Sequence, residues 1–188
     1  KELQARVVAV LCMAEALSPK YHVVVANPPY MGAKGMNEVL NTFLENHFKD
    51  SKFDLMTAFM ERSALLLQRN GIYGMINFPS WMFLTSFEKL RTSLLKSQRI
   101  LSLAHLGRGM FGSDFGSVAF IVGNAKPSKG YKGYYRRLFE QHVDVRKPET
   151  IKNLYLDKGY NAFSIDQSEL LAIPGRPIAY WISQELRG

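Results

Sequence analysis

The chain has 188 residues, of which 47% are hydrophobic, and its 24 Lys and Arg against 16 Asp and Glu give a formal net charge of +8. This is enough for a hydrophobic core in one domain or part of one, and the positive charge suits a polyanionic partner such as nucleic acid. The single cysteine, Cys12, excludes an internal disulfide and fits a reducing cytoplasm, no apolar run is long enough to span a membrane, and the histidines lack the spacing of a metal site.

Hydrophobic periodicity and turn residues predict alternating helices and strands. Residues 2–17 are expected to be helical, and the apolar run at 21–26 is typical of a buried parallel strand. Residues 31–50 should form a loop with a helical centre. A helix at 54–68 follows, and Asn70-Gly71 is expected to end it in a left-handed cap.

The second half of this pattern continues in the same way. Thr85 and Glu88 are spaced as a capping box, which predicts a helix that begins there and ends at Lys96. Apolar runs bounded by turn residues predict three further strands. They are expected at residues 72–78, 99–105 and 117–122.

The residues Asn27-Pro28-Pro29-Tyr30 directly follow the strand predicted at 21–26, and ligands bind at the carboxyl ends of strands in open α/β sheets. An exocyclic amine on an aromatic ring is a poor nucleophile because its lone pair is delocalised. Two hydrogen-bond acceptors can draw its N–H groups out of the ring plane. The Asn27 side-chain carbonyl and the Pro28 main-chain carbonyl can be these acceptors, held by rigid prolines, while Tyr30 stacks on the ring. The alternative is that the prolines only end the strand and Tyr30 is a rim aromatic.

The segment Val-Val-Ala-Asn-Pro-Pro-Tyr at 24–30 resembles the catalytic motif of amino-group methyltransferases that use S-adenosylmethionine. More narrowly, the chain resembles adenine-specific DNA methyltransferases of the gamma order. The likeness is strongest to the large methyltransferases of BREX-type phage-defence systems and to type II restriction–modification methyltransferases. The resemblance covers most of the chain and includes residues 27–32, 81–91, 104–107 and 173–181.

The resemblance implies an α/β fold: the C-terminal half of a Rossmann-like methyltransferase fold, with a mostly parallel sheet and a final antiparallel hairpin. It implies an enzyme that transfers a methyl group from S-adenosylmethionine to the N6 amine of an adenine in double-stranded DNA, in restriction–modification or phage defence. Other subunits of such a system are the further partners that it suggests. The catalytic residues that it implies are Asn27, Pro28, Pro29 and Tyr30.

To methylate a base in duplex DNA, an enzyme must flip the base out of the stack and hold it between two walls. Tyr30 is the first wall in this interpretation. The segment 109–120 resembles the family segment that supplies the second wall, and Phe111 is the matching position. Phe115 is the alternative if the loop register differs by a few residues.

Two weaker signals concern the cofactor and the DNA backbone. Phe59 lies on the helix whose start borders the cofactor in the family, so it could contact the adenine of S-adenosylmethionine; a core phenylalanine is the alternative. A basic run interleaved with tyrosines could meet DNA phosphates, or could be a solvated linker face. Its cations are Lys126, Lys129, Lys132, Arg136 and Arg137.

The chain lacks the glycine-rich segment that wraps the methionine part of the cofactor, which in this order lies upstream of the tetrapeptide. Because it also begins with Lys1 and not with Met, we expect it to be part of a longer protein. Residues 1–125 are then the catalytic half of a methyltransferase domain. Residues 126–188 are a basic linker and a partial segment that leads toward a target-recognition region. We expect the isolated chain to bind the cofactor poorly and to be inactive.

Two other functions fit part of these observations. Methyltransferases that act on RNA or on a protein glutamine carry the same tetrapeptide, but they usually lack a second aromatic wall followed by a long region. A scaffold that binds DNA or a partner without catalysis is the other alternative. An intact Asn27-Pro28-Pro29-Tyr30 argues against it for the parent protein.

Overall fold

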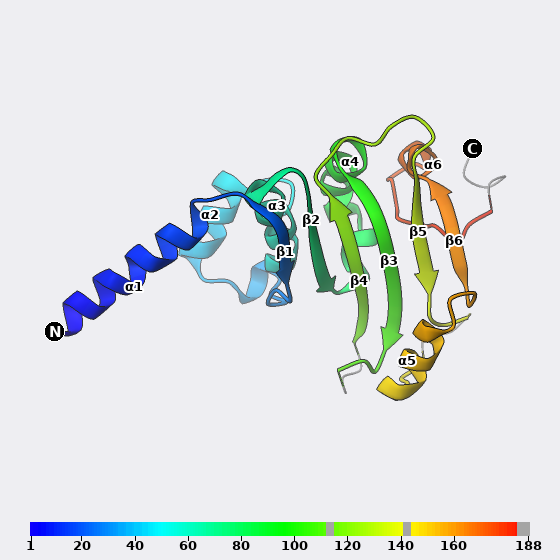
Figure 1. The fold of residues 1–188 in the computed structure, drawn as a ribbon, viewed down its shortest axis with the longest axis horizontal. Helices are drawn as coiled ribbons and strands as arrows, with labels where there is room; N and C mark the ends of the chain where they lie inside the picture. Colours follow the sequence, from blue (N-terminus) through cyan, green and yellow to red (C-terminus); the bar gives the residue numbers. More distant parts are fainter. Residues whose placement is uncertain (112–114, 141–143, 184–188) are drawn as a thin grey trace.

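The computed structural model describes residues 1–111, 115–140 and 144–183. Within these residues, six strands form one mixed sheet in the order β1-β2-β4-β3-β5-β6 (Figure 1). β1, β2, β3 and β5 run in one direction, and β4 and β6 run in the other. The strands are β1 (Tyr21–Ala26), β2 (Leu67–Asn77), β3 (Arg99–Arg108), β4 (Gly116–Gly123), β5 (Lys132–Arg137) and β6 (Ala162–Asp166).

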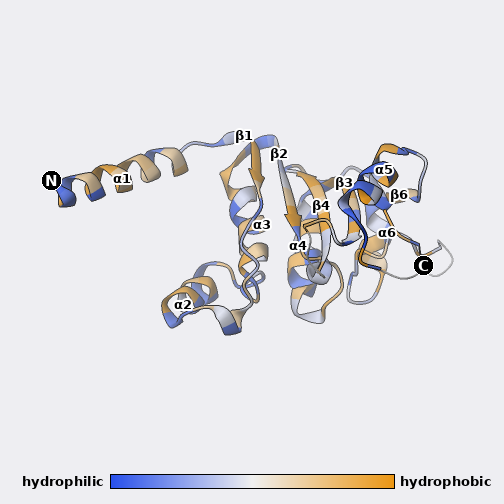
Figure 2. Cartoon of the chain, turned by 90° about the horizontal axis from the view of Figure 1, so that it is seen from below, coloured by the Kyte–Doolittle hydropathy of each residue, from blue (hydrophilic) through white to orange (hydrophobic). Residues whose placement is uncertain are grey.

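Most of the helices lie on one face of this sheet, as Figure 2 shows for α2, α3 and α4. The main core lies on this face, where α3, α4 and α6 pack against alternate residues of the strands. α5 covers part of the opposite face through Ile151, which packs with Leu106 and Leu138. The helices are α1 (Glu2–Leu17), α2 (Glu38–His47), α3 (Leu55–Leu66), α4 (Glu88–Ser97), α5 (Pro148–Leu156) and α6 (Gln167–Ala172), and short 3₁₀ turns lie at Ala33–Gly35, Pro79–Met82 and Thr85–Phe87.

The predicted α/β fold with an antiparallel hairpin is confirmed, but the sheet is mixed and not mostly parallel, and β5 and β6 follow the hairpin, so it is not the final element. β3 and β4 form the hairpin, and β4 lies between β2 and β3, antiparallel to both. The carboxyl ends of β1, β2 and β3 therefore meet at one edge of the sheet. In the part of the chain that the structure describes, no helix is both long and apolar enough to cross a bilayer.

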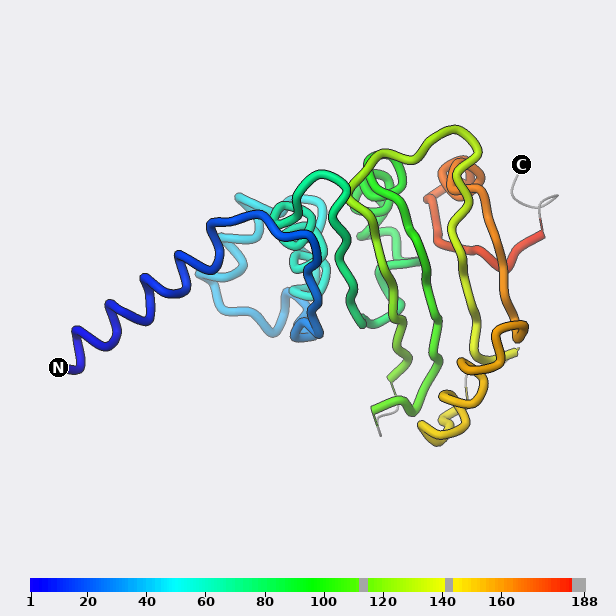
Figure 3. Tube along the Cα trace, viewed as in Figure 1, coloured from blue at the N-terminus to red at the C-terminus, as the bar shows by residue number. Residues whose placement is uncertain are grey.

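The prediction that β1 is a buried strand is wrong. β1 is at the edge of the sheet and pairs with β2 alone, so Val23 and Val25 on its outer face are 54% and 79% exposed. α1 extends away from the sheet (Figure 3), and it has no buried residue although it carries seven large apolar side chains. Nothing in the described residues covers these apolar surfaces.

Two predicted helix ends are also wrong. Asn70 has the expected positive φ of 63°, but α3 has already ended at Leu66, and Asn70 lies in an irregular part of β2. At the start of α4, Thr85 belongs to a separate 3₁₀ turn and no side chain caps the helix. The Glu88 carboxylate instead pairs with the Arg176 guanidinium at 2.6 Å.

β5 and β6, which the sequence pattern did not predict, continue the sheet beyond residue 125. β5 pairs in parallel with β3, and Tyr135 of β5 is fully buried and stacked on Tyr180 at 5.2 Å. Gly133 permits this pairing, because a Cβ atom there would lie 2.6 Å from the Ile100 carbonyl oxygen. The boundary at residues 125 and 126 stays a prediction, but the segment that follows it contributes strands to the same sheet.

Candidate functional site

The tetrapeptide Asn27-Pro28-Pro29-Tyr30 lies at the carboxyl end of β1, at the sheet edge where β2 and β3 also end. Asn27 and Pro29 are exposed, Pro28 is buried, and Tyr30 is half-buried. The buried Pro28 anchors the turn, and its fixed φ limits how the neighbouring carbonyl groups can move. This placement matches the one predicted from the sequence.

The Tyr30 hydroxyl group connects the tetrapeptide to β2. Its oxygen lies 2.9 Å from the Ile76 carbonyl oxygen and 3.1 Å from Asn27 Oδ1. A tyrosine hydroxyl is protonated at neutral pH, burial raises the pKa of Tyr30 further, and its single proton is shared between these two acceptors. An amide oxygen can accept two hydrogen bonds, so Asn27 Oδ1 retains capacity for a second donor.

Three aromatic rings from three segments form a row beside this hydroxyl. The Tyr30 and Phe78 ring centroids lie 4.1 Å apart at an interplanar angle of 37°, and Phe78 and Phe115 lie 5.3 Å apart at 38°. Phe115 remains 64% exposed, so its ring is available to a ligand. Phe111 is 57% exposed and makes no ring contact with the described residues. Of the two candidates for the second wall, Phe115 is thus the one linked to Tyr30, through the Phe78 ring.

Asp54 holds the start of α3 against the chain that follows Tyr30. Its Oδ1 accepts hydrogen bonds from the main-chain N–H groups of Met56 at 3.0 Å and Met31 at 3.2 Å. The Leu55 N–H group donates to the Met31 carbonyl oxygen at 2.9 Å. An Asp before an apolar helix is a known N-cap signal, but its bond to Met31 crosses 23 residues and has no local signature.

On the same helix, Phe59 is 38% exposed. Within the described residues Phe59 is therefore not fully buried, and its role as a core phenylalanine stays the alternative. Its ring is free to meet a ligand or another part of the protein, and its contact with the cofactor stays a prediction.

Two residues at the strand ends were not singled out in the sequence. Asn77 is fully buried at the end of β2, next to Phe78, and neither polar atom of its amide has a hydrogen-bond partner among the described residues. His105 of β3 is 7% exposed, with its ring 4.8 Å from that of Phe139. Burial and the nearby Arg137 guanidinium lower the pKa of His105 to about 4, so the imidazole is neutral at neutral pH.

The predicted DNA-contacting cations do not form one surface. Arg136 is 5% exposed, and its guanidinium donates to main-chain carbonyl oxygens at the end of α5, including those of Tyr155 at 2.6 Å and Leu154 at 2.8 Å. This corrects the assignment of Arg136 to the DNA backbone, since its donors are already used within the protein. Arg137 lies over the Phe139 and Trp181 rings, with its guanidinium carbon 5.6 and 5.7 Å from their centroids.

The lysines of the same run lie at the other end of β5. Lys132 begins β5, and Lys126 and Lys129 precede it in the connection from β4, so all three are near the amino ends of the parallel strands. Six residues of a strand span about 20 Å, which separates these lysines from the edge that carries Tyr30. Among the described residues, no group of three His, Cys, Asp or Glu side chains could hold a metal ion.

Comparisons with known proteins identify the family of the chain. The model of the Eco57I restriction-modification methylase family matches residues 7–111. The chain is 40% identical over 186 residues to the adenine-specific methyltransferase BrxX of Escherichia coli O9:H4 (strain HS), covering 96% of this chain and 15% of that protein. It is 37% identical over 178 residues to the adenine-specific methyltransferase PglX of Lacticaseibacillus casei (strain Zhang), covering 92% of this chain and 15% of that protein.

A solved structure shares the fold. The methyltransferase subunit of a type I restriction-modification system from Streptococcus thermophilus has a TM-score of 0.57 at 16% identity, over 82% of this chain and 36% of that chain. The chain spans about 15% of the length of the two curated relatives named above. With the family model matched over more than half of its residues, and with curated relatives about 40% identical across nearly all of it, the chain belongs to the Eco57I restriction-modification methylase family.

Proposed function

We propose that the protein containing this chain transfers a methyl group to the N6 amine of an adenine in double-stranded DNA, within a phage-defence or restriction–modification system in the cytoplasm. The observation that carries this proposal is the tether between Tyr30 and Asn27 at the carboxyl end of β1. It holds an amide oxygen at an exposed sheet edge beside an aromatic ring. An amine on a planar base needs these two features.

The chain's own residues act on the amine and on the ring. Asn27 Oδ1 and the Pro28 carbonyl oxygen accept the two N–H groups of the target amine and draw them out of the ring plane, which makes its lone pair available. Tyr30 stacks on one face of the flipped base, a contact worth about 1–3 kcal/mol. Phe115 supplies the second aromatic surface in this proposal, since the row through Phe78 leads to it.

S-adenosylmethionine supplies the electrophilic methyl group when it is bound. The residues of this chain fit one side of that cofactor: Asn27 is exposed at the reacting edge, and Phe59 presents an accessible ring on α3. Asp54, the carboxylate next to the tetrapeptide, is already used by two main-chain N–H groups. We therefore assign the rest of the cofactor site to further protein that covers the exposed faces of β1 and α1.

Methyl transfer by the purified intact protein tests the proposal. Radiolabelled S-adenosylmethionine and unmethylated duplex DNA should give labelled N6-methyladenine, and Asn27→Ala should remove the label while cofactor binding, measured by calorimetry, persists. Asn41→Ala is a matched control, because the Asn41 amide contacts the Ala33 and Met36 carbonyl oxygens and not the tetrapeptide. Label in RNA or in protein, with none in DNA, would contradict the proposed substrate.

A further inference from the structure

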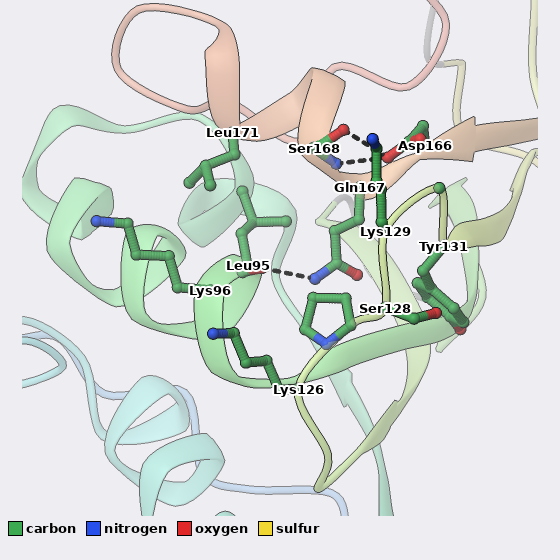
Figure 4. Close-up of a pocket in the computed structure, with 12 residues that line it drawn as sticks. Leu95, Lys96, Lys126, Ser128, Lys129, Tyr131, Asp166, Gln167, Ser168 and Leu171 are labelled. Carbon is green, nitrogen blue, oxygen red and sulfur yellow. Dashed lines mark hydrogen bonds between the residues drawn. The ribbon is translucent and has the colours of Figure 1, made fainter.

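A cavity lies at the amino ends of the parallel strands, away from the edge that carries Tyr30. Its volume is about 350 Å³, and its walls are the end of α4, the connection between β4 and β5, and the start of α6 (Figure 4). Pockets that hold small molecules begin at about this size. The connection that forms one wall passes over the ends of α4 and α6, as Figure 3 shows.

The wall between α4 and α6 is held by Gln167, which is 1% exposed. Its Oε1 accepts a hydrogen bond from the Ile100 N–H group at 3.0 Å, and its Nε2 donates to the carbonyl oxygens of Leu95 at 2.9 Å and Gln98 at 2.6 Å. One buried side chain therefore joins α4, β3 and α6. These bonds keep the cavity preformed.

Three lysines line the cavity from different segments: Lys96 on α4, and Lys126 and Lys129 on the connection. In the described part of the chain, no hydrogen bond or ion pair occupies their ammonium groups. Asp166 is the acidic residue of the lining, and its Oδ1 accepts from the Ser168 N–H group at 2.9 Å and hydroxyl at 2.7 Å. The lining thus carries three cations against one carboxylate that is already bonded.

The remaining lining is largely apolar. Leu95, Leu171 and Pro127 lie between the charged groups, and the side of Tyr131 closes one end, with its hydroxyl 3.2 Å from the Ile100 carbonyl oxygen. A simple inorganic anion would leave this apolar surface wet. A purely apolar ligand would leave the lysines without a counter-charge.

We propose that this cavity binds a small phosphate-bearing ligand with a flat apolar part, which is the chemistry of a nucleotide. Lysine ammonium groups bind phosphate as mobile point charges, and the leucine and proline surface covers a planar ring. The proposed methyl-transfer site around Tyr30 is at the opposite edge of the sheet, so this cavity is separate from it. The proposal does not depend on methyl transfer.

Lysine footprinting of the intact protein tests this site directly. An amine-reactive acetylating reagent is applied with and without ATP, and the modified lysines are quantified by mass spectrometry. ATP should protect Lys126 and Lys129, while Lys89 and Lys152, exposed lysines outside the cavity, are the matched controls. In the double variant Lys126→Ala, Lys129→Ala, the ATP concentration that gives half-maximal protection of Lys96 should rise at least tenfold.

Adenosine and inorganic pyrophosphate separate the two halves of the ligand. Each should protect Lys126 and Lys129 more weakly than ATP does. Equal protection by pyrophosphate would contradict the apolar part of the proposal. No protection at millimolar ATP, or equal protection of Lys89 and Lys152, would overturn it. A thermal melt of the double variant checks that the fold is retained, and loss of methyl transfer would not affect any of these outcomes.

Discussion

The Tyr30 hydroxyl oxygen lies 3.1 Å from Asn27 Oδ1 and reaches the Ile76 carbonyl oxygen of β2 at 2.9 Å. Tyr30 therefore has two separable parts: a hydroxyl that contacts Asn27 and Ile76, and a ring that we propose stacks on the target base. Tyr30→Ala removes both the hydroxyl and the ring. A phenylalanine variant keeps the ring and removes the hydroxyl alone.

We expect Tyr30→Phe to lower methyl transfer about tenfold without weakening the binding of the flipped base, because one orienting hydrogen bond is lost. Tyr30→Ala should also weaken base binding by roughly 1–3 kcal/mol. Single-turnover kinetics measure the first effect, and the fluorescence of 2-aminopurine at the target position measures the second. If Tyr30→Phe retained full activity, the hydroxyl would have no role in orienting Asn27.

The aromatic row makes a prediction that distinguishes two phenylalanines. Phe115→Ala should weaken binding of the flipped base, since Phe115 continues the row from Tyr30 through Phe78. Phe111→Ala should have a smaller effect, and it serves as the matched control because both side chains are exposed. The same 2-aminopurine signal compares them, and a larger loss with Phe111→Ala would assign the second wall to Phe111.

Arg91 is expected to matter for stability. Its guanidinium is 1% exposed and donates to the carbonyl oxygens of Trp81 at 2.9 Å, Leu84 at 2.7 Å, Gly175 at 2.7 Å and Arg176 at 2.8 Å. Arg91→Met leaves these acceptors without donors and should lower the free energy of unfolding by about 2–4 kcal/mol.

Arg91→Lys should not restore that stability, since an ammonium group cannot reproduce the planar fork of donors. Urea denaturation measures both variants. Arg62→Met, a change at an exposed position on α3, is the control and should stay near the parent value. Full stability of Arg91→Lys would show that the positive charge alone, without the fork geometry, holds the two segments that carry these carbonyl oxygens.

His105 predicts a loss of stability in acid. Burial and Arg137 lower its pKa from the usual 6.5 to about 4, so the unfolded chain takes up a proton before the folded chain does. The stability that the neutral His105 side chain contributes is therefore fully present above pH 6.5 and is lost as the pH falls toward 4. Between pH 7 and pH 5 the loss from this residue is about 2 kcal/mol.

Urea denaturation at pH 7 and pH 5 measures this dependence. His105→Gln cannot bind the proton and should show a smaller loss over that range. His47→Gln changes an exposed histidine and should keep the parent's dependence. An unchanged pH dependence in His105→Gln would show that other groups control the acid sensitivity.

The sequence predicted the position of the tetrapeptide in the fold because that signal is local. A strand followed by Asn27-Pro28-Pro29-Tyr30 can be recognised from adjacent residues, and the strands at 99–105 and 117–122 appear within β3 and β4. The hydrogen bond from Tyr30 to Ile76 joins residues 46 positions apart, so no local sequence pattern predicts it. The same is true of the aromatic row, which depends on how β2 and the chain before β4 meet.

The burial of β5 could not be predicted from the sequence, for a different reason. In β5, Lys132 and Gly133 are followed by two tyrosines and two arginines, a composition shared by a solvated basic surface and by a buried strand. Arg136 is buried because α5 and the turn after it place main-chain carbonyl oxygens around its guanidinium, and those acceptors lie 18 to 24 residues away. β1 was expected to be buried because its valines are apolar, but burial depends on what covers them.

The most direct test of the central claim is the methylation state of genomic DNA. The intact protein and its Asn27→Ala variant would be expressed, with any partner subunits, in a host without DNA methylation, and N6-methyladenine would be mapped by sequencing. We predict a methylated adenine at a defined target with the parent protein and none with Asn27→Ala. Methylation that persists in Asn27→Ala would contradict the role of the tetrapeptide, and its absence in both strains would contradict the proposed activity.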